Sequence, residues 1–125
     1  MAETTSQRHE RELAEVVPGG RQVLASGAKL DRHDVRTEQS GTTWLFRYEA
    51  KCTQRKSYSF KAAEWKDLVE YATLRGERPA WAVRFYGEGE VSSSLPVKAD
   101  LVVVELNDWC EVLAELERLR GGQAE

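Results

Sequence analysis

Cysteine is scarce in this sequence. Its two cysteines, Cys52 and Cys110, lie far apart and outside any Cys-x-x-Cys pattern. A structural zinc site or a disulfide framework needs cysteines in closely spaced or repeated groups. The sequence therefore argues against both, and a reducing cytoplasm is the simplest setting for two free thiols.

Long apolar segments are also missing. No run reaches the length of a membrane-spanning helix, and the first ten residues lack the apolar stretch of a signal peptide. The 125 residues, 41% of them apolar, suffice for one modest core and leave little room for a second domain. We expect one domain over residues 7–120, flexible ends at 1–6 and 121–125, and no membrane partner.

The sequence also lacks the strong positive charge of many nucleic-acid-binding proteins. Its formal net charge is −3, but the charge is unevenly distributed. Residues 7–87 contain 15 Lys and Arg against 11 Asp and Glu, whereas residues 88–125 contain 3 against 9. The mildly basic body permits nucleic-acid binding without demonstrating it.

What the sequence does contain is an alternation of helix and strand patterns. Apolar spacing predicts helices over 7–17 and 61–75, and a last helix that begins at a cap formed by Asn107 or Asp108. Residues 87–97 are expected to form a loop. Alternating patterns and turn signals predict strands over 21–25, 34–38, 43–52, 80–86 and 101–105. This order indicates an α/β or α+β domain with a central mixed β-sheet flanked by helices.

The longest strand pattern carries the sharpest chemical signal. Glu49 and Lys51 are two residues apart, so they point to the same face of the strand. A turn joins this strand to the preceding one, which begins at Asp34, and we expect Asp34 to lie near Glu49. The opposite, aromatic face is predicted to be the core side: Trp44, Phe46, Tyr48, Ala50 and Cys52. Trp65, Trp81 and Trp109 are also expected to fill the core.

Two carboxylates on adjacent strands, with an amine beside them, suit phosphodiester chemistry. Carboxylate oxygens bind hard cations such as Mg²⁺, with Mn²⁺ as a substitute. Such an ion stabilises charge on a phosphodiester and acidifies an attacking water, while the Lys51 ammonium orients that water or neutralises the transition state. The ordinary alternative is a solvent face, because many strands carry alternating charges there.

Two further features favour a site. On a helical wheel, Glu10 lies at the border of the apolar stripe that contains Leu13, from where a carboxylate can reach the sheet edge. Arg55 and Lys56 follow closely after Lys51, where a DNA backbone would pass a bound metal. A boundary glutamate and a solvated turn are the competing interpretations.

Together these stretches resemble the archaeal-type Holliday-junction resolvases and their phage relatives, within the PD-(D/E)XK nucleases. The resemblance spans residues 8–86 in the family's order and implies a restriction-endonuclease-like fold. The matching segments are Glu10-Arg11-Glu12-Leu13, Ser26-Gly27-Ala28-Lys29, Asp34-Val35, Tyr48-Glu49-Ala50-Lys51-Cys52-Thr53, Leu68-Val69-Glu70-Tyr71-Ala72 and Pro79-Ala80-Trp81-Ala82-Val83-Arg84-Phe85.

The resemblance implies a metal site and its catalytic groups. Asp34 and Glu49 match the family's metal-binding carboxylates, and Glu10 matches its helix glutamate, which we also assign to the metal. The backbone carbonyl of Ala50 is an expected further metal ligand. Lys51 matches the catalytic lysine.

The resemblance also implies contacts to the substrate. Ser26 matches a serine near the scissile phosphate. His33 stands where the motif's name has proline, and Asp31 competes with Asp34 as the first carboxylate; Asp34 is preferred because a strand pattern follows it directly. The cations expected to contact DNA are Arg8, Lys29, Arg32, Arg55 and Lys56.

The sequence thus predicts a Mg²⁺-dependent endonuclease that hydrolyses phosphodiester bonds in branched DNA such as a four-way junction. A homodimer is expected, since two-fold symmetry lets two sites cut opposing strands. The family likeness favours a prokaryotic cell or a phage-infected host. The alternatives are a restriction-type or flap nuclease, or a catalytically silent module that binds DNA or a protein partner. The apolar stripe of the last helix, which continues to Leu119, either closes the core or forms a dimer.

Overall fold

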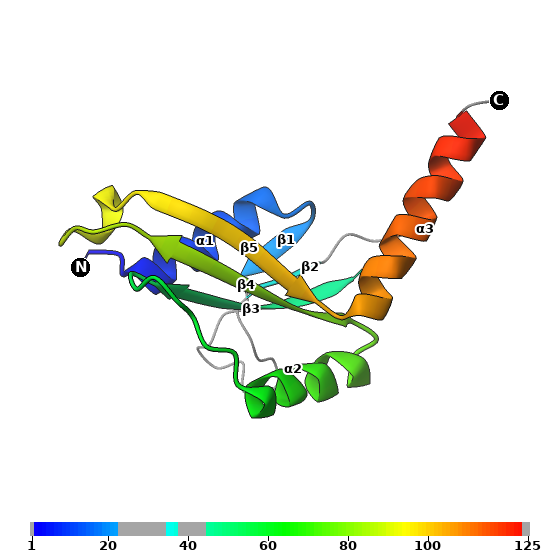
Figure 1. Ribbon diagram of the computed structural model, residues 1–125, viewed down its shortest axis with the longest axis horizontal. Coiled ribbons are helices and arrows are strands. Elements are labelled where there is room, and N and C mark those ends of the chain that lie inside the picture. The colour runs from blue at the N-terminus through cyan, green and yellow to red at the C-terminus, as the bar shows by residue number, and fades with distance from the viewer. Residues whose placement is uncertain (1, 23–34, 38–44, 124–125) are drawn as a thin grey trace.

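The computed structural model describes residues 2–22, 35–37 and 45–123. Over these ranges the chain is an α+β fold in which helices flank a mixed β-sheet (Figure 1), and this confirms the fold class expected from the sequence. The elements in chain order are α1 (Thr5–Val16), β1 (Gly20–Gln22), β2 (Val35–Thr37), β3 (Phe46–Thr53), α2 (Ala62–Leu74), β4 (Arg78–Tyr86), the 3₁₀ turn η1 (Ser92–Ser94), β5 (Val97–Val104) and α3 (Leu106–Gln123).

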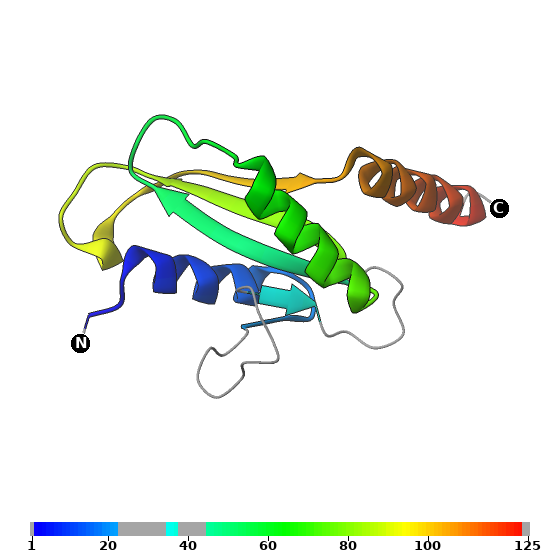
Figure 2. The same cartoon turned by 90° about the horizontal axis from the view of Figure 1, so that it is seen from below.

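The described strands form one sheet in the order β1-β2-β3-β4-β5. Neighbouring strands are antiparallel, except that β3 and β4 are parallel and pair from Phe46 with Arg78 to Thr53 with Phe85. A parallel pair needs a crossover connection, and α2 provides it. Figure 2 shows α1 and α2 on opposite faces of the sheet, so β3 and β4 are covered from both sides.

α1 begins two residues before the position predicted from the sequence because Thr4 caps it. The Thr4 hydroxyl accepts a hydrogen bond from the Gln7 N–H (3.1 Å), and the Gln7 side chain accepts one from the Thr4 N–H (2.9 Å). His9 and Leu13 face the sheet; His9 Nε2 lies 3.2 Å from the carbonyl oxygen of Ala82 on β4. The capped helix is thereby seated over β3 and β4.

The face of β3 turned away from α1 also belongs to the core. There α2 covers Trp81 and Val83 of β4, with Leu68 almost fully buried between them. Arg47 of β3 is 0% exposed, and its Nε donates a hydrogen bond to Glu77 at 2.7 Å. The aromatic face is a core side as predicted, since Tyr48 and Ala50 pack against Leu13, but the crossover helix covers the second face as well.

β5 and α3 depart most from the predicted elements. β5 begins at Val97 rather than residue 101, and the expected loop before it contains η1. α3 projects away from the sheet (Figure 1), and Trp109 is 50% exposed, so it does not fill the core as predicted, whereas Trp81 does. Within the described ranges, no helix combines the length and the apolar character needed to cross a bilayer.

Candidate functional site

Glu49 and Lys51 lie side by side on β3, on the face toward α2. Lys51 Nζ is 3.5 Å from Glu49 Oε1, and the two side chains are 34% and 21% exposed. The alternation of the strand puts both on one face, as the sequence predicts. The structure thus brings together two of the predicted site residues at a position that solvent reaches.

This pair opens into a pocket of about 390 Å³ between β3, β4 and α2. Trp81 contributes an aromatic wall, and α2 contributes two carboxylates, Glu64 and Asp67, that were not predicted from the sequence. Glu64 stands four residues before the buried Leu68, on the same side of the helix, and that spacing is the signal from which it was predictable. The pocket is therefore acidic apart from Lys51.

The surroundings keep Lys51 charged. Burial opposes the ammonium charge, but the carboxylate of Glu49, together with Tyr58 and Glu64, outweighs burial and raises the pKa of Lys51 above its ordinary value of 10.5. Its Nζ also lies 5.8 Å from the centre of the Trp81 ring, within the range of a cation–π contact. At neutral pH Lys51 is therefore an electrostatic group rather than a proton acceptor.

Glu10 belongs to α1, the helix that packs against the other face of β3. It is half-buried on α1, beside His9 and three residues before Leu13, and it does not line the pocket of Glu49. Ala50 packs on the same side, against the cluster around Leu13. Glu10 and Glu49 thus come from different elements, and Glu10 does not line the pocket.

Several predicted residues lie outside the described ranges. They are Ser26, Lys29, Asp31, Arg32 and Asp34. Over residues 2–22, 35–37 and 45–123, no group of three or more His, Cys, Asp or Glu side chains has an arrangement that would hold a metal ion. Glu49 is of the right type for a hard cation, with accessible oxygens in a pocket. The described part of the chain therefore supplies members of the predicted metal set but not the complete set.

Two of the cations predicted to contact DNA lie at the rim of a larger cleft. Arg55 and Lys56 are exposed in the turn after β3 and line a cleft of about 740 Å³ with Lys98 of β5. Phe85 and Leu101 give the same cleft apolar walls. Lys98 was not predicted, because only the pairing of β4 with β5 brings it beside the β3 turn.

Arg8 has a structural role that competes with the predicted DNA contact. Its Nη1 donates hydrogen bonds to the carbonyl oxygens of Ser92 (2.8 Å) and Leu95 (2.9 Å), and its side chain is only 14% exposed. The guanidinium also lies 5.2 Å from the Tyr86 ring centre. Arg8 therefore fastens α1 to the η1 turn, and the position does not support the predicted DNA contact.

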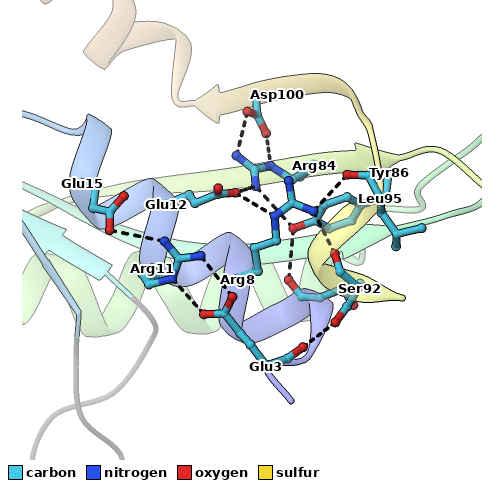
Figure 3. A network of polar contacts seen from close by, with 11 residues as sticks. Glu3, Arg8, Arg11, Glu12, Glu15, Arg84, Tyr86, Ser92, Leu95 and Asp100 are labelled. Carbon is cyan, nitrogen blue, oxygen red and sulfur yellow. Dashed lines mark hydrogen bonds and ion pairs between the residues drawn. The ribbon is translucent and has the colours of Figure 1, made fainter. Parts of the chain in front are cut away.

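A second arginine holds α1 to the sheet (Figure 3). Arg84 is 7% exposed and donates to both carboxylate oxygens of Asp100 on β5 (2.7 and 3.0 Å) and to Glu12 on α1. The hydrogen bond to Asp100, above all, raises the pKa of Arg84. This network fixes the position of α1, and Glu10 with it, relative to β3.

Comparison of the sequence with protein-family models and with curated proteins found no match to either.

Proposed function

We propose that this protein is a metal-dependent endonuclease of the restriction-endonuclease-like fold that hydrolyses phosphodiester bonds in branched DNA, as a Holliday-junction resolvase does. The observation that carries the proposal is the Glu49–Lys51 pair, 3.5 Å apart in a solvent-accessible pocket on β3. The order of elements supports it, since a helix, paired strands, a second helix and a further strand follow one another as expected from the sequence.

The position of β2 in the chain supports Asp34 as the first carboxylate. Val35 pairs with Tyr48 and Arg36 with Arg47 in an antiparallel ladder. Asp34 lies outside the described ranges but directly precedes β2 in the sequence, and this adjacency favours it over Asp31.

In the proposed reaction, water attacks phosphorus, the bond to the leaving sugar oxygen breaks, and that oxygen gains a proton. Mg²⁺, when bound, would stabilise charge on the phosphate and acidify the water. Glu49 and Asp34 would hold the ion by hard-oxygen ligands, with Glu10 and the carbonyl of Ala50 as further candidates. The Lys51 ammonium would stabilise the negative charge of the transition state.

The cleft beside Arg55, Lys56 and Lys98 supports a path for the DNA backbone. Arg55 and Lys56 follow β3 by only a few residues, and Lys98 adds a third cation on the same cleft. Phosphate contacts of this kind position a duplex without reading its sequence. They suit a nuclease that recognises a branched shape.

The proposal is tested by incubating the full chain with a synthetic four-way junction, with and without Mg²⁺. Flap and linear duplex substrates run in parallel separate a resolvase from a flap or restriction-type nuclease. Glu49→Gln keeps the side-chain shape and is expected to slow cleavage on the order of 100-fold or more. Glu70→Gln, on an exposed position of α2, is the matched control.

Two results would contradict the proposal. If Glu49→Gln cleaved the junction at the wild-type rate, Glu49 would not belong to a catalytic site. Binding of the junction without cleavage in either Mg²⁺ or Mn²⁺ would favour a silent DNA-binding module on the same scaffold.

A further inference from the structure

α3 presents an apolar stripe that nothing in the described part of the chain covers. Its large apolar residues lie at helical spacing and, with the half-buried Val112, fall within about 140° of the helix surface at 100° per residue. The helix carrying them projects from the sheet (Figure 1). Their exposed fractions are high: Leu106 72%, Trp109 50%, Leu113 42%, Leu116 50% and Leu119 47%. A continuous apolar stripe of this kind marks an interaction surface.

We propose that α3 pairs with α3 of a second copy of this chain in antiparallel orientation. The stripe is symmetric about the middle of the helix, so reversing one copy brings apolar residues opposite apolar residues. A two-fold interface requires such self-complementarity. The resulting pairs are Leu106 with Leu119, Trp109 with Leu116, and Val112 with Leu113.

The charges along α3 favour this orientation. Arg120 lies in its last turn, within the angular range of the stripe, and Glu105 directly precedes its first turn; Asp108 and Glu111 in its first half already bind Arg78. An antiparallel pair puts Arg120 of one copy beside the first turn of the other, where acidic side chains are attractive. A parallel pair instead places Arg120 opposite its own counterpart, and like charges at close range are unfavourable.

The foot of α3 offers a seat for the end of the second helix. A groove of about 390 Å³ there is lined by Leu106, Phe60, Trp65 and Val103 among others. Phe60 is 49% and Val103 36% exposed. Because the antiparallel pairing brings Leu119 of the second copy to Leu106, that leucine reaches this groove. One partner thus covers both the stripe and the groove.

A homodimer belongs to the function proposed above, and in that respect this inference rests on it. The surface itself is argued from exposure, symmetry and charge alone. Its test therefore needs no cleavage, and Glu49→Gln is expected to dimerise as the wild type does. A protein that dimerises but has no nuclease activity would contradict the proposed function and would leave the proposed interface supported.

The oligomeric state is measured by sedimentation velocity and light scattering on the full chain, at a concentration on the order of 10 μM. The wild type is expected to be a dimer. Leu113→Glu places two carboxylates near the two-fold axis and is expected to raise the dimer Kd on the order of 100-fold. Ala114→Glu is the matched control, because it adds the same charge at an exposed neighbouring position outside the stripe and should leave the dimer intact.

Two results would overturn the interface. One is a monomeric wild type at that concentration. The other is a Leu113→Glu variant that dimerises as tightly as Ala114→Glu. Far-UV circular dichroism of each variant establishes that α3 remains helical.

Cysteine cross-linking tests the orientation. With Cys110→Ser in the background and Cys52 common to all variants, Leu113→Cys lies next to the axis and is expected to oxidise to a covalent dimer. Leu106→Cys is expected to stay uncross-linked, because its counterpart lies at the far end of the pair. Efficient cross-linking through Leu106→Cys would instead show a parallel pair and contradict the proposal.

Discussion

The proposed cleavage reaction depends directly on the positive charge of the Lys51 side chain. Lys51→Met keeps the length of the side chain but removes the charge beside Glu49, 3.5 Å away. We expect junction cleavage to fall on the order of 100-fold to 1000-fold, with junction binding changed only a few-fold, in a single-turnover assay. Lys66→Met, at a position that is 78% exposed, should cleave normally. Full activity in Lys51→Met would leave this lysine without a catalytic role.

The Arg47–Glu77 pair is the charged contact buried most deeply in the described core. Arg47 is 0% and Glu77 8% exposed, and 2.7 Å separates their interacting atoms. Glu77→Ala removes the carboxylate and leaves the buried guanidinium with one fewer partner, so the free energy of unfolding should drop by about 3–5 kcal/mol in urea titrations. Glu70→Ala, at a 63% exposed position, should change it by less than about 0.5 kcal/mol. A loss under about 1 kcal/mol for Glu77→Ala would mean that water or other side chains compensate the charge.

The local sequence pattern predicted which segments form helices and strands better than it predicted which other segments these elements contact. Two-residue alternation in β3 placed Glu49 and Lys51 on one face, because that geometry is local. It did not predict the partners of Arg47 or Arg84, since these come from segments far along the chain. The start of β5 was missed for the same reason: Asp100 interrupts the apolar pattern, and it is tolerated in the strand because it binds Arg84.

The attachment of α1 to the sheet should depend on pH through Glu12. Burial raises the pKa of this carboxyl, but the hydrogen bond from Arg84 and the charges of Arg8 and Arg84 outweigh burial and lower it below 4.5. Because the pKa of Glu12 is lower in the folded protein, its ionised carboxylate stabilises the fold. This contribution is complete above pH 4.5, the ordinary pKa of the group, and is lost as the pH falls through the pKa in the folded protein. Acid should therefore loosen α1 from β4 and β5.

Glu12→Gln tests this attachment (Figure 3). We expect it to lower the free energy of unfolding by about 1–2 kcal/mol at neutral pH, because it removes charged hydrogen bonds. The difference from wild type should shrink as the pH falls through the lowered pKa of Glu12, because the protonated carboxyl and the amide are then both neutral. Amide hydrogen exchange in α1 should be faster in the variant. Glu15→Gln, 64% exposed and paired only with Arg11 in Figure 3, should change neither quantity; an equal effect would place the stabilising contact elsewhere on α1.

For the protein taken as a whole, the sequence predicted one mixed sheet between two helices but left the last helix undecided. Helical spacing fixes which residues share the stripe of α3, yet it does not fix whether the chain turns the helix back onto the core. The structure sends α3 outward with its leucines exposed, and the spacing of residues within the helix does not specify that direction. The predicted metal set stays a prediction, because Asp34 lies outside the described ranges.

With an overall charge of −3, the proposed DNA binding would depend on a few local cations rather than on a broad basic surface. Arg55, Lys56 and Lys98 gather at one cleft, so a backbone bound there would release counterions from only a few phosphates. The affinity for a junction should therefore fall only moderately with salt. In fluorescence anisotropy titrations, Lys56→Ala should weaken binding to junction and duplex alike and reduce the slope of log K against log salt by about 1. Lys66→Ala, which lies on α2 away from the cleft, should leave the slope unchanged. Equal slopes for Lys56→Ala and wild type would show that DNA does not bind at this cleft. The cations of the cleft would then have no part in holding the substrate near Glu49.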